Sequence, residues 1–186
     1  MASWSRIATR MRVPLGFVFA AAYFWFARPA WAWIAAGAVL IVAGILVRAM
    51  ASGHIRKNRE LTTTGPYAYT RNPLYLGSVL IAAGFVIAAR NPWIALAALA
   101  MFAVVYVPVI RAEEKYLSSL FPGYAEYAAQ VPRLLPRLGA YRPAAAEDDY
   151  GSFSRELYLK HREYNAALGS ALMIGALILK MVLVQH

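Results

Sequence analysis

Five uninterrupted apolar stretches divide the 186-residue chain, at positions 13–27, 31–47, 74–89, 93–110 and 166–179. None of them contains a charged residue, and each is 14 to 18 residues long. A helix needs about 20 apolar residues to cross a bilayer, but flanking Arg and Lys side chains can reach the interface and make up the difference. The pattern therefore predicts an all-α, polytopic membrane protein with five transmembrane helices.

Two connections between these stretches are very short, at 28–30 and 90–92, so the helices that they join are expected to be antiparallel neighbours. The fold expected is two antiparallel hairpins plus a C-terminal helix. Ser154 is predicted to cap this last helix, which is expected to run on without a break into the fifth apolar stretch. The domains predicted are an N-terminal transmembrane hairpin (1–48), a core of cytoplasmic loop, transmembrane hairpin and cytoplasmic segment (49–138), a linker (139–153), and a C-terminal amphipathic and transmembrane helix (154–186).

The tripeptide Arg-Asn-Pro occurs twice, at 71–73 and at 90–92, each time directly before an apolar stretch. Asn is favoured as a helix N-cap, and Pro is favoured at the first helical position, where its missing N–H costs nothing. Both copies are therefore predicted to start a helix. The copies differ in what surrounds them, since only the first follows a long polar loop.

The basic residues are distributed unevenly around the apolar stretches, and the net charge is +10. Positive charge concentrates in loops on the cytoplasmic side of a membrane protein. The pattern therefore places the N-terminus and the 48–73 loop in the cytoplasm, at a bacterial inner membrane, and it argues against a nucleic-acid partner. The lipid bilayer is the partner expected, and the oligomeric state stays open. Three Arg precede the first stretch (Arg6, Arg10, Arg12), five basic residues lie between the second and third (Arg48, Arg56, Lys57, Arg59, Arg71), and the hairpin turns carry only Arg28 and Arg90.

Several classes of site have no sequence signal. The chain has no Cys, and its three His residues lack metal-ligand spacing, so no metal site is predicted. No nucleophile elbow, P-loop or dinucleotide fingerprint occurs. The first four apolar stretches hold no ionisable side chain except Tyr, which argues against a small proton-coupled transporter. A non-enzymatic membrane protein, a transporter or an assembly factor, nevertheless remains an alternative of another class.

The loop at 54–77, HIRKNRELTTTGPYAYTRNPLYLG, is richer in turn-forming and hydrogen-bonding residues than a connection between two helices requires. One interpretation is a basic interfacial loop that turns at Gly65-Pro66 and carries aromatic side chains at the membrane surface. The other is a binding site that faces the cytoplasm.

Within this loop, LTTTGPYAYTRNPLYLG at 61–77 resembles the signature of the isoprenylcysteine carboxyl methyltransferase family and of the related membrane phospholipid methyltransferases. That signature runs Leu-Val-Thr-x-Gly-x-Tyr and then Arg-His/Asn-Pro-x-Tyr-x-Gly. In the family a second Asn-Pro, a Glu-Glu pair and a Tyr- and Pro-rich tail follow. This chain has them in that order, at 91–92, 113–114 and 121–136. The resemblance extends over about 52–136.

The resemblance implies S-adenosylmethionine as methyl donor, S-adenosylhomocysteine as product, and an amphiphilic acceptor that arrives from the lipid. The acceptor implied is similar to an isoprenylcysteine carboxylate, with a phospholipid amine as the alternative. Two positions depart from the common pattern: Asn72 stands where many members have His, and Arg59 where the eukaryotic enzymes have a His near the cofactor. The positions that match imply catalytic roles for Arg71 and Glu114 and cofactor binding by His54, Leu61, Gly65, Tyr67, Asn72, Pro73, Tyr75 and Glu113.

Physical considerations agree with these roles. Methyl transfer from a sulfonium is an in-line displacement, which positioning and exclusion of water can catalyse. The helix start at Asn72-Pro73 offers a positive dipole end to a carboxylate. Adjacent helical side chains diverge by about 100°, so one of Glu113 and Glu114 is expected to face the ligand. Arg71 can orient an anionic acceptor, or it can serve only as a positive charge near lipid headgroups.

Overall fold

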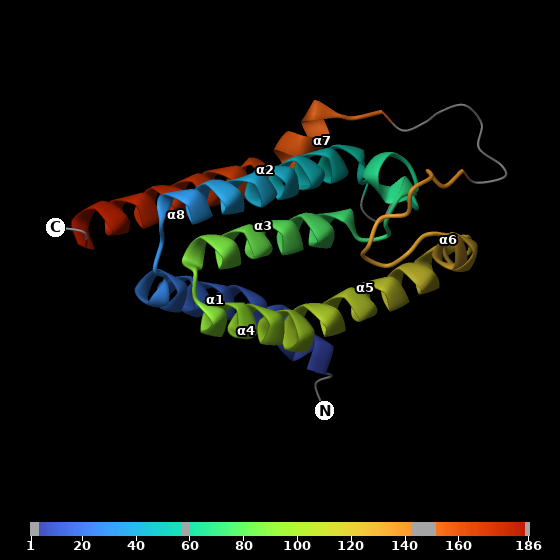
Figure 1. Cartoon of the computed structure of the whole chain (residues 1–186). Helices are drawn as coiled ribbons and strands as arrows, with labels where there is room; N and C mark the ends of the chain where they lie inside the picture. Colours follow the sequence, from blue (N-terminus) through green and yellow to red (C-terminus); the bar gives the residue numbers. More distant parts are fainter. Residues whose placement is uncertain (1–3, 57–59, 143–151, 185–186) are drawn as a thin grey trace. The chain divides into compact units, whose positions relative to one another are not determined.

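The computed structural model describes residues 4–56, 60–142 and 152–184, and all regular elements in this part of the chain are helices (Figure 1). The all-α prediction is confirmed for these residues. In chain order the elements are α1 (Trp4–Phe26), α2 (Trp31–His54), the 3-10 helix η1 (Gly65–Ala68), α3 (Pro73–Ala89), α4 (Pro92–Met101), the π-helical turn η2 (Phe102–Tyr106), α5 (Val107–Leu120), α6 (Tyr124–Gln130), α7 (Arg155–Lys160) and α8 (Tyr164–Val184).

Three helical segments among the described residues are long and apolar enough to cross a membrane: Trp31–His54, Pro92–Leu120 and Tyr164–Leu183. The second of these combines α4, η2 and α5. The apolar parts of α1 and α3, Pro14–Phe26 and Pro73–Ala89, are shorter. An integral membrane protein with three candidate spans is thus established, whereas crossings by α1 and α3 stay predictions.

The chain divides into two compact units, each of which combines segments that are distant in sequence. Unit 1 consists of Met1–Ile41, Ile81–Glu114 and Gly169–His186, and unit 2 of Val42–Leu80 and Lys115–Leu168. The domain boundaries predicted from the sequence are a different division and stay predictions.

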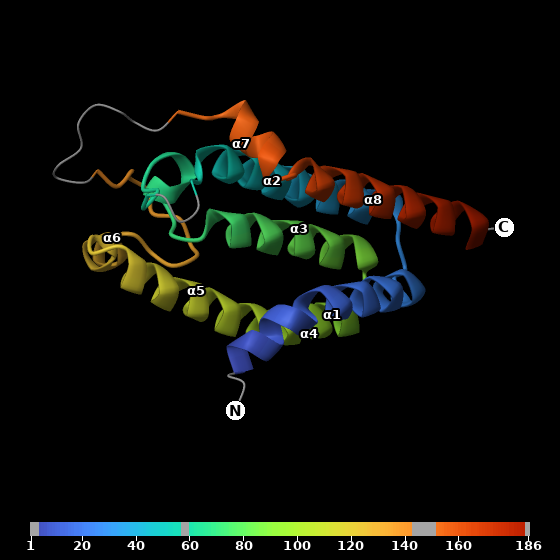
Figure 2. The same cartoon turned by 180° about the vertical axis from the view of Figure 1, so that it is seen from behind.

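The core of unit 1 is formed by apolar side chains from α1, α2, α3, α4 and α8. The helix α1 also packs against η2, the turn that follows α4 (Figure 2). Tyr23 adds a polar contact, because its hydroxyl donates to the carbonyl of Phe85 over 2.9 Å. The two hairpin turns are joined directly, since the backbone N–H of Arg28 donates to Ala89 O over 2.8 Å. The buried residues of this core are Tyr23, Ala27, Ile34, Ala88, Ala89, Ile94, Leu177 and Met181.

Glycines bring α2 and α3 into backbone contact within each unit. In unit 1, a Cβ built on Gly37 would collide with the carbonyl oxygen of Gly84, and a Cβ on Gly84 with that of Gly37. In unit 2, a Cβ on Gly77 would lie 2.6 Å from Gly44 O and 2.5 Å from Arg48 Cγ. Small residues allow helices in membranes to approach this closely. The α2–α3 pair therefore has no space for larger side chains at these positions.

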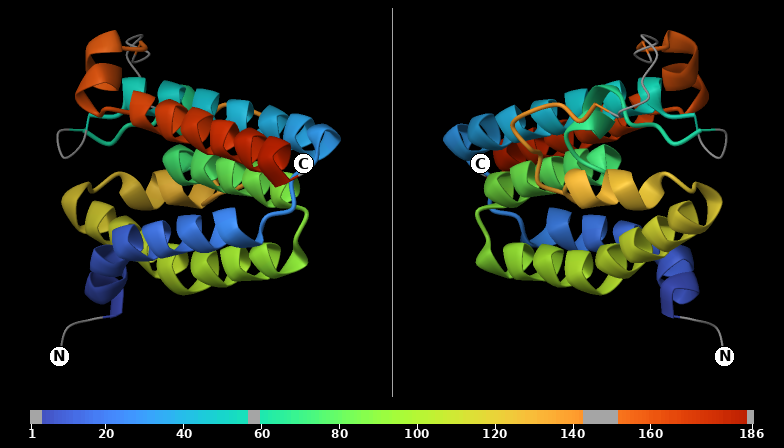
Figure 3. Two further views of the ribbon diagram at one scale, coloured as in Figure 1. Left: turned by 90° about the vertical axis from the view of Figure 1, so that its left-hand side faces the viewer. Right: turned by 90° about the vertical axis from the view of Figure 1, so that its right-hand side faces the viewer.

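The expected continuous C-terminal helix is wrong, because the structure forms two helices there, α7 and α8 (Figure 3). Arg162 lies between them with φ at +53°, a left-handed conformation that a helix cannot contain. The predicted cap is confirmed, since Ser154 Oγ accepts from Leu157 N over 3.3 Å. Most of the predicted linker, at 143–151, lies outside the described residues.

Candidate functional site

In unit 2 the polar loop pairs with the segment that follows α6. This pairing unites two parts of the chain, the 61–77 signature and the Tyr- and Pro-rich tail, whose separation in sequence gave no indication of contact. The loop therefore has the backbone partners of an ordered structure rather than those of a free connection. Three backbone hydrogen bonds join the segments: Arg71 N–H to Pro132 O (3.0 Å), Arg137 N–H to Tyr69 O (3.0 Å) and Tyr141 N–H to Ala68 O (2.9 Å).

Buried polar side chains strengthen the same pairing. Thr70 is 2% exposed, and its hydroxyl donates to Leu134 O over 3.0 Å. Asn72 is 9% exposed, and its Nδ2 donates to Arg133 O over 2.9 Å. Each of these groups would be costly to bury without a partner. Thr70 and Asn72 thus fix the loop immediately before α3.

A cluster of aromatic rings forms the core beneath the loop. Tyr127 contacts Tyr141 edge to face at 5.4 Å between ring centroids, and its hydroxyl donates to Tyr67 O over 2.7 Å. Leu61 packs against this cluster, and Tyr67 itself is buried. Burial raises the pKa of the Tyr141 hydroxyl above its usual value, and the Glu126 carboxylate adds to this increase. Of the Tyr side chains in the loop itself, Tyr67 is buried, Tyr75 is half-buried and Tyr69 is 40% exposed. The cluster therefore supports the loop at Tyr67, through the bond from Tyr127.

His54 and Gly65 are in direct contact at the other end of the loop. Gly65 has φ of +57°, and a Cβ there would lie 2.5 Å from Cδ2 of the His54 ring. His54 Nδ1 lies 2.7 Å from Met50 O, which fits an Nδ1–H donor and leaves Nε2 as an acceptor in the neutral ring. Phe153 packs on the same ring at 6.2 Å. The missing side chain at Gly65 is therefore required by both conformation and space.

The remaining predicted residues divide between the two units. Pro73 is buried as the first residue of α3, and Arg71 and Tyr75 beside it are half-buried. Glu113 and Glu114 belong to unit 1, where Glu113 is exposed and Glu114 is 7% exposed. The structure therefore distinguishes the two carboxylates, as expected for neighbours on a helix. Eight predicted site residues fall in unit 2: His54, Leu61, Gly65, Tyr67, Arg71, Asn72, Pro73 and Tyr75. Arg59 lies outside the described residues.

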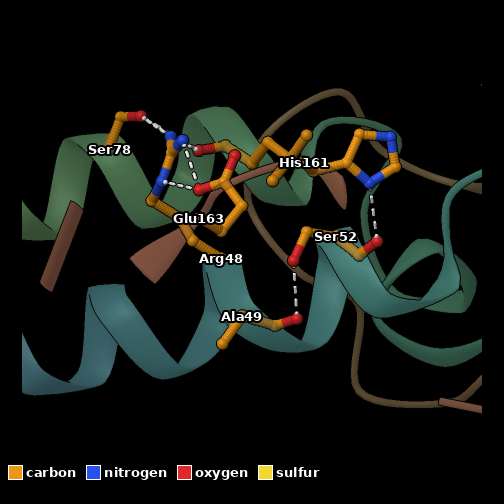
Figure 4. Close-up of polar contacts among 7 residues, drawn as sticks. Arg48, Ala49, Ser52, Ser78, His161 and Glu163 are labelled. Carbon is orange, nitrogen blue, oxygen red and sulfur yellow. Dashed lines mark hydrogen bonds and ion pairs between the residues drawn. The ribbon is translucent and has the colours of Figure 1, made fainter. Parts of the chain in front are cut away.

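The sequence did not indicate an ion pair between α2 and the turn that precedes α8 (Figure 4). Arg48 Nη2 lies 2.7 Å from Glu163 Oε2, and their side chains are 23% and 12% exposed. Nη1 of Arg48 donates to Ser78 Oγ over 2.6 Å and to Leu74 O over 3.1 Å. From the sequence, Arg48 is predicted only as part of the basic loop. No local pattern indicates its partner, because Glu163 lies 115 residues further along the chain, next to Arg162.

In the second Arg-Asn-Pro copy, the contacts of the Asn91 side chain are structural. Asn91 Oδ1 accepts from Trp93 N over 2.9 Å, which makes it the N-cap of α4. Its Nδ2 donates to Phe26 O over 3.0 Å and so ties the two hairpin turns together. In the first copy, Asn72 also starts a helix, because its carbonyl accepts from Leu76 N over 2.9 Å. Only the first copy adjoins the folded loop.

The assembled part of the site is an ordered loop that ends at a helix N-terminus. Backbone N–H groups in the first turn of a helix attract anions, and the start of α3 lies directly after the buried Asn72. The described residues include no group of three or more His, Cys, Asp or Glu that could hold a metal ion. The arrangement is suited to hold a soluble molecule with a carboxylate against a rigid loop.

Comparison with known proteins agrees with this location. Residues 32–123 match a family described as phospholipid methyltransferase, a range that contains the whole loop and the Glu113-Glu114 pair. The chain is 40% identical over 87 residues to the cobalt-zinc-cadmium resistance protein CzcN of Cupriavidus metallidurans, a match that covers 47% of this chain and 40% of the relative. It is 41% identical over 108 residues to the nickel-cobalt-cadmium resistance protein NccN of Alcaligenes xylosoxydans xylosoxydans, covering 55% and 48%. The chain thus spans less than half the length of either relative. No solved structure matches it.

Proposed function

We propose a function on the premise that this chain belongs, through residues 32–123, to the phospholipid methyltransferase family. In this proposal the protein is an integral membrane methyltransferase that uses S-adenosylmethionine and modifies an amphiphilic acceptor delivered by the bilayer. Family membership and the three candidate spans support the general activity and the membrane location. The cofactor, the acceptor and the residue roles are proposals.

The observation that carries the proposal is the fixed conformation of the loop inside the matched range. Thr70 and Asn72 hold it by buried hydrogen bonds, and the His54 ring occupies the space that a Cβ on Gly65 would need. A loop fixed in this way fits the cofactor, whose carboxylate would lie at the N-terminus of α3. When bound, S-adenosylmethionine would supply an electrophilic methyl group on a sulfonium. A rigid loop can contribute to its transfer by holding the reactants in line.

Burial and charge support the residue roles proposed here. Glu114, buried on α5, is proposed to accept hydrogen bonds from the ribose hydroxyls or the amino group of the cofactor. The exposed Glu113 is proposed to contribute less than Glu114 to cofactor binding. Arg71 is proposed to orient an anionic acceptor, while Leu61, Tyr67 and Tyr75 shape the loop. His54 supports Gly65 through their contact.

The acceptor proposed is an amphiphile similar to an isoprenylcysteine carboxylate, because Arg71 supplies a cation for a carboxylate. A phospholipid amine is the alternative within the family, and it would have to lose its proton before methylation. The relatives are named for resistance to cobalt, zinc, cadmium and nickel. A non-enzymatic transporter or assembly factor in metal resistance is therefore the alternative of another class.

The test uses the purified full chain in lipid nanodiscs with labelled S-adenosylmethionine and a panel of prenylcysteines, thiols and lipid extracts. Calorimetry with S-adenosylhomocysteine measures binding separately from turnover. Absence of binding would reject the proposal, and calorimetric binding of Co²⁺, Zn²⁺ or Cd²⁺ without it would support the metal-resistance alternative. Transfer of the label to a lipid amine rather than to a carboxylate would show that the acceptor is a phospholipid amine and not an isoprenylcysteine-like carboxylate.

Site residues are tested by Arg71→Ala and Glu114→Gln, with Arg155→Ala and Glu156→Gln on the exposed surface of α7 as matched charge controls. Loss of a charged hydrogen bond costs about 1.5–3 kcal/mol, so Glu114→Gln should weaken cofactor binding by at least about tenfold. Glu113→Gln should have a smaller effect. Cofactor affinity near wild type in Glu114→Gln, together with acceptor turnover near wild type in Arg71→Ala, would refute the site but not the family.

A further inference from the structure

A cavity of about 490 Å³ lies in unit 1 beside the two hairpin turns and α8. Three cationic side chains line it: Arg28 from the first turn, Arg90 from the second, and Lys180 from α8. None of the described residues that line it is acidic. The backbone bond from Arg28 N–H to Ala89 O brings the two Arg-bearing turns together. The cavity therefore concentrates positive charge from three distant parts of the sequence.

The three cationic side chains differ in their hydrogen bonding. Lys180 Nζ donates to the carbonyls of Phe24, Trp25 and Ala27 over 2.6, 2.8 and 2.8 Å, so it caps the C-terminal end of α1. All three of its donors are in use. Lys180 fixes the wall of the cavity and adds charge to it, without a donor to spare for a ligand.

The guanidinium groups of Arg28 and Arg90 are different, because both belong to exposed residues and neither has a carboxylate partner in the described part of the chain. Arg90 lies over the Trp33 ring at 5.7 Å, which orients it but leaves its N–H donors available. The described part of unit 1 has carboxylate side chains only at Glu113 and Glu114, on α5. Two Arg forks beside a cavity are suited to bind a phosphate.

The aromatic side chains around the turns indicate where this cavity lies in a membrane. Trp25, Trp31 and Trp93 are 78%, 60% and 75% exposed, and Trp25 also lines the cavity. Exposed Trp side chains at helix ends are typical of the membrane–water interface. Phosphate groups of phospholipids lie at the same depth, so the cavity opens where headgroups are found.

We propose that this cavity binds the phosphate of an anionic phospholipid headgroup, held by Arg28 and Arg90, with Phe26 and Met181 against the apolar part of the lipid. The site is separate from the loop of unit 2 and does not depend on the proposed methyl transfer. Because the short turns lie opposite the positive loops in the predicted topology, the lipid would come from the non-cytoplasmic leaflet.

The test is native mass spectrometry of the full chain with dioleoyl phosphatidylglycerol, dioleoyl phosphatidylcholine or inorganic phosphate. We expect tight binding of one phosphatidylglycerol, with Kd raised at least about tenfold in Arg28→Gln/Arg90→Gln, as for lost charged hydrogen bonds. The control Arg111→Gln/Arg155→Gln removes the same formal charge from exposed sites and should bind like wild type.

Equal loss in both double variants would mean general attraction between charges and would overturn the site. Phosphatidylcholine bound as tightly as phosphatidylglycerol would overturn the preference for anionic lipid. Inorganic phosphate bound as tightly would overturn the lipid as ligand. Should Arg28→Gln/Arg90→Gln fail to fold, Arg28→Lys/Arg90→Lys keeps the charge but removes the planar forks. It should weaken binding severalfold, and unchanged binding in it would contradict the assigned geometry.

Discussion

The side-chain amide of Asn72 donates to the carbonyl of Arg133 over 2.9 Å, although the two residues are 61 positions apart. This bond connects the first Arg-Asn-Pro copy to the tail after α6. In the second copy, the Asn91 side chain bonds to the adjacent helix start at Trp93 and to the neighbouring hairpin turn at Phe26. One tripeptide thus serves two purposes, and substitution can separate them.

We expect Asn72→Ala to weaken S-adenosylhomocysteine binding about fivefold or more, because the loop loses a buried anchor worth about 1–3 kcal/mol. Asn91→Ala is the matched control. It removes an N-cap, which costs about 1 kcal/mol of stability, and should leave cofactor affinity unchanged. Calorimetry and thermal unfolding in detergent measure the two effects. Equal losses of affinity in both variants would contradict a site at the first copy only.

Gly65→Ala should damage the loop. An L side chain at the φ of +57° costs about 1–2 kcal/mol, and the new Cβ would also press on the His54 ring. We expect reduced cofactor affinity by calorimetry and faster amide exchange at 65–72.

The control for this substitution is Gly139→Ala, where a Cβ would meet nothing within 4 Å. The double variant His54→Ala/Gly65→Ala removes the collision and keeps the backbone strain, so it should recover part of the protection against exchange. Full recovery of the protection would mean that the backbone strain is unimportant. No recovery would mean that the collision with His54 is unimportant.

Arg48→Met should be strongly destabilising, because it leaves the Glu163 carboxylate mostly buried without its partner. The cost of breaking such a pair is about 3–5 kcal/mol. Arg48→Met/Glu163→Leu should be less destabilised than Arg48→Met alone. The exposed pair of Arg56 and Glu60, at 3.6 Å, offers a comparison, since Arg56→Ala should cost less than about 1 kcal/mol. A double variant worse than Arg48→Met would contradict an unpaired charge as the cause.

Stability should decrease at high pH partly through Tyr141. Burial raises the pKa of its hydroxyl in the folded state, with the Glu126 carboxylate adding to the effect. The folded state therefore holds this proton more tightly than the unfolded state. The contribution is fully present below about pH 10, the usual pKa of Tyr, and is lost as the pH rises through the raised value.

Thermal unfolding of wild type and Tyr141→Phe between pH 8 and pH 11.5 isolates this contribution, since the other titrating groups are common to both. The difference in melting temperature should shift in favour of Tyr141→Phe as the pH increases. A constant difference would show that Tyr141 ionises in the folded state as it does in the unfolded chain.

Helix starts were predictable from the sequence because local chemistry determines them. Pro73 and Pro92 begin α3 and α4 as the Asn-Pro pairs indicated, and Trp31 begins α2. The end of α2 was not predictable from hydropathy alone. The apolar stretch ends at 47, but the helix continues to His54, because Arg48 finds a carboxylate 115 residues away and Ser52 Oγ bonds to Ala49 O.

The residues of the candidate site were predictable from the sequence, but the contacts that hold them in place were not. The signature selected Gly65 and Asn72 by resemblance, and the structure gives each a physical reason. Thr70, which the signature did not single out, is more deeply buried than either. Its importance depends on the carbonyls of Arg133 and Leu134. No local sequence pattern predicts hydrogen-bond partners that lie more than 60 residues away in the chain.

The hydrogen bonds between the loop and the tail also set an order for biosynthesis. Asn72 leaves the ribosome 61 residues before Arg133, and the residues between them include all of α3, α4 and α5. The loop must therefore wait, without its final partners, while these helices are made. Contacts between distant segments form late because chain entropy opposes them until the intervening structure exists. A nascent chain stalled before residue 131 should leave the Thr70 and Asn72 side chains without their tail carbonyls, and the loop open to proteolysis.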